Sequence, residues 1–265
     1  MTVRAGVVGW PIAHSLSPLL HGAWIAAAGI DARYEAHGPE TPGAFADLVA
    51  RGRTGELRGL NVTAPYKEQA LALADTASDI ARRAGSANLL VFEAGRVSAD
   101  STDGEGLMQA LEEQAPALSV TGRTVVVLGA GGAARAAVSA LMDRAADVAV
   151  LNRTAERARA LSEALGARVG TEDDLRDAVL VVNALSVPPT IDLKALPDDA
   201  VAMDMTYRPL DTPFLAAARA CGLTGVDGLA MLIGQARPSF EAFFGVAPPP
   251  IDVRAIALAH LGEAA

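Results

Sequence analysis

Blocks of apolar residues alternate with polar turns along the chain, and they predict strands that are each followed by a helix. The first block, TVRAGVVGW (residues 2–10), has the apolar run and closing glycine of a short buried strand. The next, SPLLHGAWIAAAG (17–29), predicts a helix that Ser17 can cap, with Pro18 at its first position and Gly29 as its stop.

Two further segments of the first half predict strands, at ARYEAH (32–37) and LRGLNVT (57–63). The segment ANLLVFEAGRVSAD (87–100) predicts a hairpin that turns at Ala94 and Gly95. The first half is therefore expected to form a small α/β unit.

The second half repeats the strand-then-helix order more plainly. A helix at 102–114 leads into three successive strand-led units, which cover 123–144, 146–165 and 177–185. Alternation of this kind predicts an α/β fold with a parallel sheet and helices on both faces. The tail after residue 228 is expected to be helical, with Pro238 starting a new turn or kinking the helix.

The most specific motif follows the apolar run VVVL at 125–128. The helix there is opened by Gly129, Ala130, Gly131, Gly132, Ala133 and Ala134. This order satisfies the G-x-G-x-x-G/A dinucleotide fingerprint, in which the first glycine permits a tight turn and the second lets the backbone approach a pyrophosphate. The helix N-terminus then offers free N–H groups to the phosphates. A tight strand–helix turn without a ligand is the alternative interpretation.

The next strand indicates which dinucleotide binds. An NAD site carries Asp or Glu about 20 residues after the fingerprint, for the ribose 2′-hydroxyl. This chain has Asn152, Arg153 and Thr154 there, with Arg157 one helical turn on. Arginine binds a 2′-phosphate through paired charge-assisted hydrogen bonds, so we predict NADP(H) rather than NAD(H). The alternative is that Arg153 and Arg157 are solvated surface residues.

The composition of the chain excludes several classes of binding partner. The chain has 265 residues, a size that favours two domains, and its net charge of −9 argues against a nucleic-acid surface. No apolar run approaches the roughly 20 residues of a membrane span, and the first residues lack a signal-peptide pattern. Cys221 is the single cysteine, which excludes an internal disulfide and a cysteine-rich metal site. We expect a cytoplasmic protein with a small-molecule substrate.

The first hundred residues are expected to bind that substrate. Ser15 and Ser17 can grip a carboxylate or a polyol, although Ser17 could equally serve as a helix cap. His14 and His21 are better explained by packing or hydrogen bonding than by metal binding, because no cluster of Cys, Asp or Glu accompanies them. We therefore predict no metal.

The segment GLNVTAPYK (59–67) predicts the reacting group. Asn61 and Thr63 share one face of a strand, and Lys67 is expected in the first turn of a helix that Pro65 starts. Lys67 and Lys194 are the two lysines among 22 basic Lys and Arg residues. Arginine does not deprotonate near neutral pH, so a proton-transfer position must keep its lysine, whereas Lys194 can be a surface residue.

A carboxylate is available where the two halves join. Asp103, in SADSTDGEG, could pair with Lys67 and share a proton with a substrate hydroxyl. The alternative for Asp103 is the N-cap of the following helix.

These motifs together resemble the shikimate dehydrogenase family, over nearly the whole chain. The matching segments are GWPIAHSLSPLLH, NVTAPYK, AGSANLL, STDGEG, GAGGAAR, NRTAER, DMTYRPLDTPFL and DGLAMLIGQA. The chain departs from the family pattern most clearly at Leu185, where Thr is usual beside the cofactor.

The resemblance implies an enzyme that reversibly reduces 3-dehydroshikimate to shikimate with NADPH, on the route to chorismate and the aromatic amino acids. It implies that Lys67 is the catalytic acid/base, paired with Asp103. For the substrate carboxylate it implies Ser15, Ser17 and Tyr207, and for the ring hydroxyls it implies Asn61, Thr63, Asn88 and Gln235. For the cofactor it implies 129–133 at the pyrophosphate, 152–157 at the 2′-phosphate, and Met205 and Gly228 at the nicotinamide. Asp79 lies near where some members carry an acid that faces the cofactor.

The implied architecture has two lobes. Residues 1–103, completed by helices of 229–265, would form the substrate-binding domain, and residues 104–228 the Rossmann-like NADP domain. The protein is expected to be a monomer or a homodimer. Two alternatives remain at this point: a quinate/shikimate dehydrogenase of broader specificity, and a non-catalytic NADPH-binding regulator.

Overall fold

The computed structural model describes residues 2–185 and 187–262. The chain divides into two compact units, Met1–Thr102 with Gln235–Ala265, and Asp103–Gly234. Their boundaries lie at 102/103 and 234/235, whereas the sequence predicted 103/104 and 228/229. Asp103 therefore belongs to the second unit.

The first unit is built on a mixed sheet of six strands, in the order β2-β1-β3-β5-β6-β4. The strands are β1 (Val3–Val8), β2 (Ala32–His37), β3 (Gly59–Val62), β4 (Thr76–Ala77), β5 (Leu89–Glu93) and β6 (Arg96–Asp100). β1 pairs in parallel with β2 and β3, and β5 is antiparallel to both β3 and β6. The predicted hairpin is confirmed, because Ala94 and Gly95 connect β5 to β6 with φ values of 50° and 77°.

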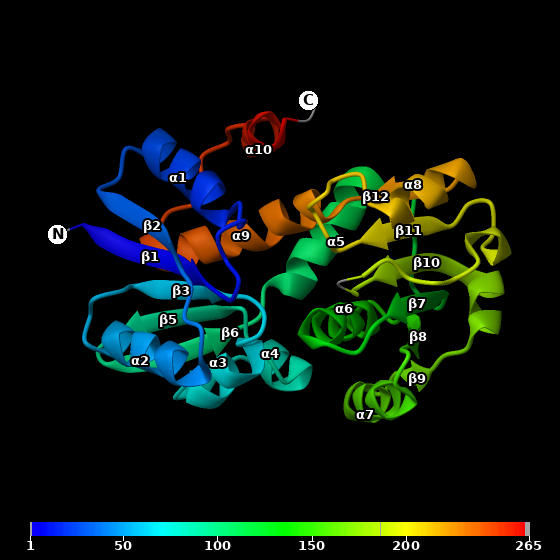
Figure 1. Ribbon diagram of the computed structural model, residues 1–265, viewed down its shortest axis with the longest axis horizontal. Coiled ribbons are helices and arrows are strands. Elements are labelled where there is room, and N and C mark those ends of the chain that lie inside the picture. The colour runs from blue at the N-terminus through cyan, green and yellow to red at the C-terminus, as the bar shows by residue number, and fades with distance from the viewer. Residues whose placement is uncertain (1, 186, 263–265) are drawn as a thin grey trace. The chain divides into compact units, whose positions relative to one another are not determined.

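Helices cover both faces of this sheet (Figure 1). They are α1 (Ser17–Ala28), α2 (Pro42–Arg53), α3 (Lys67–Leu73), α4 (Asp79–Ala84), α10 (Val253–Leu261) and the part of α9 (Gly228–Phe244) that follows Gly234. On one face, Val8, Leu60 and Val62 pack in a common core with residues of α2. The opposite face, which holds Tyr34, lies against α1 and α9 through ring contacts with His21 and Phe243.

Local structure departs from the sequence prediction at Ser17, Pro65 and Pro238. Leu16, and not Ser17, is the N-cap of α1, so Ser17 is already helical. Helix α3 begins at Lys67, two residues after Pro65, because Thr63–Tyr66 form a turn closed by a hydrogen bond from the Tyr66 N–H to the Thr63 carbonyl. Helix α9 runs through Pro238 as one helix, so the proline does not start a new one, and the kink stays a prediction.

The second unit contains a parallel sheet of six strands, in the order β12-β11-β10-β7-β8-β9. The strands are β7 (Thr124–Leu128), β8 (Asp147–Leu151), β9 (Arg168–Val169), β10 (Ala178–Asn183), β11 (Val201–Asp204) and β12 (Thr224–Val226). In chain order this is the doubly wound arrangement 3-2-1-4-5-6, whose ligand crevice lies at the carboxyl ends of the strands where the order reverses, here between β7 and β10.

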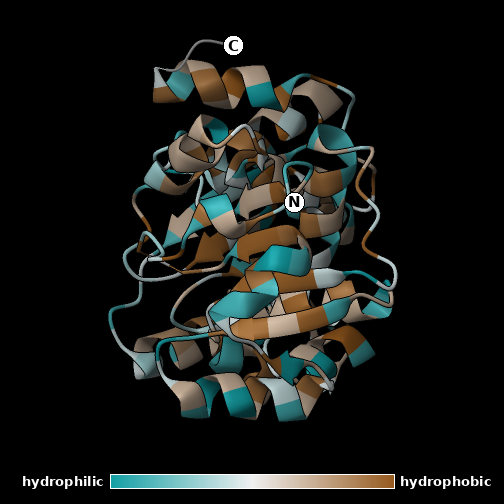
Figure 2. Cartoon of the chain, turned by 90° about the vertical axis from the view of Figure 1, so that its right-hand side faces the viewer, coloured by the Kyte–Doolittle hydropathy of each residue, from teal (hydrophilic) through white to brown (hydrophobic). Residues whose placement is uncertain are grey.

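Helices also cover both faces of the parallel sheet. They are α5 (Asp103–Gln114), α6 (Gly132–Asp143), α7 (Ala155–Leu165), α8 (Pro213–Ala220) and two short 3₁₀ helices, η1 (Glu172–Asp177) and η2 (Leu193–Ala195). Alternate residues of β7 enter opposite cores: Val125 and Val127 pack with α5 and α6, and Val126 and Leu128 pack with α8 and η1. A parallel sheet covered on both faces has strands that are apolar throughout. In Figure 2 brown predominates in strands at the centre, whereas the surrounding helices mix teal and brown residues.

Among residues 2–185 and 187–262, no helix is long and apolar enough to cross a membrane. No group of three or more His, Cys, Asp or Glu side chains in those residues could hold a metal ion.

Candidate functional site

The predicted substrate residues of the first unit gather at one edge of its sheet. β1 and β3 are parallel neighbours, so the loops that follow Val8 and Val62 leave the sheet at the same edge. The two loops are joined by a hydrogen bond from the Trp10 N–H to the Ala64 carbonyl, 3.1 Å. Gly9 permits this approach, because a Cβ there would lie 2.4 Å from Cγ2 of Thr63.

Ser15 and Ser17 lie in the loop after β1 and at the start of α1. The Ser15 hydroxyl accepts a hydrogen bond of 3.3 Å from the Ser17 N–H. The Ser17 side chain makes a hydrogen bond with Tyr34. Ser17 is buried and Ser15 is half-buried. The alternative role of Ser17 as the helix cap is wrong, because Leu16 takes the N-cap position and Ser17 lies inside the helix.

Lys67 is the first residue of α3 and is half-buried. Its carbonyl accepts a hydrogen bond of 2.9 Å from the Ala87 N–H, which anchors the start of the helix beside Asn88. The preceding loop is tied to β1 by a 2.9 Å hydrogen bond from the Thr63 N–H to the Val8 carbonyl. The backbone at Lys67 is thus held on both sides.

Asn88 and Gln235 meet behind this edge. The Asn88 amide donates to Oε1 of Gln235 and to Oγ1 of Thr102, at 3.0 Å each, and Asn88 Oδ1 accepts from the Thr102 N–H at 2.8 Å. Since the Gln235 oxygen is occupied, its amide N–H groups are the part that can donate to a ligand. Gln235, from the far end of the chain, is thereby joined to residues of the first hundred.

Asn61 belongs to the same network through two residues that sequence reasoning missed. Its side chain contacts the Tyr34 hydroxyl and Ser239, each at 2.7 Å. Tyr34 lies in a segment that the sequence predicts as a strand, and Ser239 in one that it predicts as a helix. Nothing in their local sequence signals a functional role.

Three further predicted residues belong to other elements. Asp103 is buried at the first position of α5, inside the helix and not before it as a cap. Tyr207 lies in the loop that follows β11. Asp79 is exposed at the start of α4, and its carboxylate pairs with Arg82 of the same helix at 3.0 Å.

In the second unit, the glycine turn occupies the crevice between β7 and β10. Gly129 has φ of +115°, a backbone conformation that residues other than glycine rarely adopt. Its N–H donates to the Leu151 carbonyl at 2.8 Å. Gly131 is the N-cap of α6 and has no side chain to cap the helix, so the first N–H groups are open to an anion. This cradle fits a dinucleotide pyrophosphate. Leu185 lies against the turn, with Cδ2 3.2 Å from a Cβ built on Gly129.

The predicted 2′-phosphate residues follow the neighbouring strand, β8. The Asn152 amide donates to the Thr154 carbonyl at 2.9 Å, and Thr154 is the N-cap of α7 without a side-chain cap. Arg153 and Arg157 are exposed on this loop and the first turn of α7. Two exposed arginine residues thus flank a helix N-terminus, an arrangement that suits a phosphate.

Met205 and Gly228, predicted at the nicotinamide, lie against one another. A Cβ on Gly228 would lie 2.6 Å from the carbonyl oxygen of Met205, so only glycine fits this approach. The Met205 N–H donates to the Asn183 carbonyl at 3.0 Å, which ties the loop after β11 to the end of β10.

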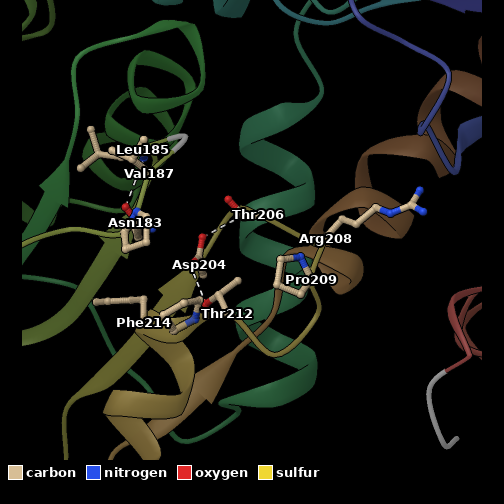
Figure 3. A pocket seen from close by; sticks show the side chains of 11 residues that line it. Asn183, Leu185, Val187, Asp204, Thr206, Arg208, Pro209, Thr212 and Phe214 are labelled. Carbon is tan, nitrogen blue, oxygen red and sulfur yellow. Dashed lines mark hydrogen bonds between the residues drawn. The ribbon is translucent and has the colours of Figure 1, made fainter.

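A buried carboxylate braces the loop that carries Met205 and Tyr207. Asp204 accepts hydrogen bonds from the Thr206 N–H at 2.9 Å and from the Thr212 hydroxyl at 2.8 Å, drawn as dashed lines in Figure 3. Beside it lies a pocket of about 130 Å³, lined in part by Asn183, Leu185 and Phe214. Since both carboxylate oxygens of Asp204 accept hydrogen bonds from this loop, we assign Asp204 to bracing the loop.

His21 should make folding stability depend on pH. It is fully buried among Tyr34, Trp24, Phe240 and Phe243, and burial lowers its pKa to about 3. Below the ordinary pKa of 6.5 the unfolded chain binds a proton that the folded chain does not, so stability falls as the pH drops from 6.5 towards 3. At pH 5 the neutral, buried His21 lowers the free energy of unfolding by about 2 kcal/mol relative to neutral pH.

The measurement is urea unfolding of the wild type and of His21→Phe at pH 7.5 and pH 5. Relative to the wild type, the variant should gain about 2 kcal/mol of unfolding free energy between the two pH values, because phenylalanine cannot bind the proton. An unchanged difference between the two proteins would show that His21 does not carry this dependence.

Comparison with known proteins follows the same division of the chain. Residues 7–90 match the family described as "Shikimate dehydrogenase substrate binding domain", and residues 110–188 match "Shikimate / quinate 5-dehydrogenase". The chain is 52% identical to the shikimate dehydrogenase (NADP(+)) of Caulobacter vibrioides (strain NA1000 / CB15N), over 98% of this chain and 96% of the relative.

Two solved structures are similar over almost the full length. One is the shikimate 5-dehydrogenase of Thermus thermophilus in complex with NADP(H) and shikimate, at 37% identity and a TM-score of 0.87, covering 94% of this chain and 96% of that one. The other is the quinate dehydrogenase of Corynebacterium glutamicum in complex with NAD, at 30% identity and a TM-score of 0.86, covering 97% and 99%.

Proposed function

This chain belongs to the shikimate dehydrogenase family, and from that premise we propose that it reduces 3-dehydroshikimate reversibly to shikimate with NADPH, using Lys67 for proton transfer. It is an NADP-dependent oxidoreductase of the chorismate and aromatic amino acid pathway, with 52% identity to a shikimate dehydrogenase (NADP(+)) along nearly its whole length. The observation that carries the proposal is the group of Ser15, Asn61 and Lys67 at one sheet edge, in a chain that also holds the glycine turn at Gly129.

The residues that would hold the cofactor lie in the second unit. Gly129, with residues 130–133, would take the pyrophosphate, and Arg153 and Arg157 the 2′-phosphate. Met205 and Gly228 would border the nicotinamide. When bound, the cofactor supplies the hydride, and the protein orients the reactants and transfers the proton.

The first unit would hold the substrate. Ser15 and Ser17, with Tyr207 of the second unit, would bind its carboxylate. Thr63, Asn61, Asn88 and Gln235 would bind ring hydroxyls. Asn61 would do so through its oxygen, which accepts from Tyr34 and can accept one more hydrogen bond, because both of its N–H groups have protein partners. Gln235 would do so through its N–H groups, because its oxygen accepts from Asn88.

Lys67 would give a proton to the carbonyl oxygen during reduction and take one from the hydroxyl in the reverse direction. We propose that Asp103 pairs with Lys67 and orients it. A buried carboxylate can hold an ammonium group in place by a charge-assisted hydrogen bond. The proposed role of Asp79 at the cofactor is the weakest, since its carboxylate already pairs with Arg82.

Two other functions predict different results. A quinate dehydrogenase has support from the 30% identity to the enzyme of Corynebacterium glutamicum, whose structure contains NAD. Against it stands the loop at Asn152–Thr154, which has arginine and no carboxylate. A non-catalytic regulator would not require Lys67. A cytoplasmic location and a monomeric or homodimeric state stay predictions of the sequence.

The test is the appearance of NADPH or NADH absorbance with the four combinations of shikimate or quinate and NADP or NAD. Shikimate with NADP should give the highest kcat/KM, and exchanging NADP for NAD or shikimate for quinate should lower it at least about 10-fold, because charged or polar groups then lose their partners. Comparable rates with quinate and NAD would favour the broader enzyme. No turnover with any pair, while NADPH still binds, would favour the regulator.

A further inference from the structure

The orientation of the Asn61 amide is fixed by a serine on α9. The Ser239 hydroxyl donates to the Gln235 carbonyl at 3.1 Å, and a carbonyl only accepts. Ser239 must therefore accept from Asn61, which places Nδ2 of Asn61 at 2.7 Å from Ser239. The other N–H of this amide donates to the Asn88 carbonyl at 3.3 Å. Both Asn61 donors are used within the protein.

The oxygen of the same amide faces Tyr34. The Tyr34 hydroxyl donates to Oδ1 of Asn61 at 2.7 Å. Burial raises the pKa of Tyr34 well above its ordinary value of 10.0, and a side-chain hydrogen bond with Ser17 lowers it in part. Tyr34 therefore keeps its proton near neutral pH and contacts two of the predicted substrate residues, Ser17 and Asn61.

The sheet makes room for this contact. Tyr34 pairs with Ala5 of β1, which pairs in turn with Gly59 of β3, and Asn61 follows on the same face two residues later. Ala5 and Gly59 are small, so the tyrosine ring can cross β1 towards Asn61. At Gly59 a Cβ would lie 2.2 Å from the Phe243 ring, so that glycine also lets α9 close over this face.

The tyrosine ring is itself held on its open side. The His21 ring stacks on it with centroids 3.9 Å apart and planes 2° from parallel. Phe243 lies 6.3 Å from the Tyr34 ring, at 42°. Tyr34 is 8% exposed, so these ring contacts and the surrounding residues hold its side chain in one orientation.

We propose that Tyr34 is a positioning residue that holds Asn61 and Ser17 together, so that Asn61 presents its oxygen to one ring hydroxyl of the substrate. Tyr34 does not itself react. Its hydroxyl orients the Asn61 amide from one side and Ser239 orients it from the other. This inference rests on the proposed function, because it assigns how that site holds one ring hydroxyl of shikimate.

The test is Tyr34→Phe, which keeps the ring and its stack on His21 and removes only the hydroxyl. KM for shikimate should rise on the order of 10-fold, as when a buried acceptor loses its donor, with little change in kcat. KM for NADP should stay as in the wild type. Ser239→Ala should give the same pattern, and the double variant should show less than the product of the two effects.

A second readout separates positioning from loss of structure. Shikimate analogues that lack one ring hydroxyl, at C4 or at C5, are compared in the wild type and in both variants. One analogue lacks the ring hydroxyl that donates a hydrogen bond to Asn61. For that analogue, the wild type and the variants should have the same KM. Equal losses with shikimate and with both analogues, in both variants, would overturn the inference.

The proposed function and the inference fail in different ways. Wild-type protein that does not oxidise shikimate would refute the function. Active wild type with unchanged KM in both Tyr34→Phe and Ser239→Ala would refute the inference alone. If Tyr34→Phe does not fold by circular dichroism, Ser239→Ala, at the other side of the amide, decides the result.

Discussion

Replacing Lys67 by alanine is expected to lower the turnover of shikimate by about 10²–10⁴-fold, the usual contribution of one well-placed proton-transfer group. The amine lies at the start of α3, whose backbone is tied to Ala87, so the substitution should leave the surrounding loop in place. The measurement is kcat from NADPH absorbance, together with shikimate affinity by calorimetry. The variant should still bind shikimate, because other side chains are proposed to hold its carboxylate and hydroxyls.

The chain supplies a matched control in its second lysine. Lys194 is exposed on η2 in the other unit, and Lys194→Ala removes the same charge and the same side chain. It should leave kcat unchanged. If Lys67→Ala keeps more than about a tenth of wild-type turnover, the proton must come from another group, and the assignment of Lys67 would have to be withdrawn.

The second large effect concerns the choice of cofactor. Changing both Arg153 and Arg157 to alanine should raise KM for NADP by about 10–100-fold, since one or more charge-assisted hydrogen bonds to the 2′-phosphate are lost. KM for NAD should change little, because NAD has no phosphate there. Steady-state kinetics with each cofactor, at saturating shikimate and fixed ionic strength, measure both values.

Arg159→Ala serves as the control for charge. Arg159 is exposed on the same helix, α7, but lies beyond the loop after β8. Its removal changes the net charge without touching the proposed phosphate site. Should the double variant and Arg159→Ala raise KM for NADP equally, the effect would be one of general electrostatics, and the two arginines would be surface residues.

The elements that the sequence predicted well are those fixed by neighbouring residues. Gly29 ends α1 in the left-handed conformation with φ of 62°, as its position after the apolar helix indicated. The glycine turn at Gly129 lies between β7 and α6, where the apolar run and the helix opening placed it. Each depends on backbone angles over a few residues, which glycine and apolar order determine locally.

Some elements were missed although a local signal exists. Helices α2, α4 and α8 were not predicted, yet each follows a cap whose side chain accepts a helix N–H: Thr41, Ser78 and Thr212. Thr41 and Thr212 precede proline, a common helix start. The short strands β4, β9 and β12 carry too few residues for an alternating pattern to be recognised.

The sequence by itself therefore determined the α/β class, the dinucleotide turn and the residue types available for chemistry, because these depend on local order. Only the tertiary structure decided which atoms they present. Tyr34 and Ser239 lie 27 and 178 residues from Asn61, and they meet it through strand register and the closure of α9 over the sheet. Ser17 likewise became a partner of Tyr34 and not a helix cap, since Leu16 takes the N-cap position of α1. Contacts of this kind depend on packing between distant segments, which local propensity does not encode.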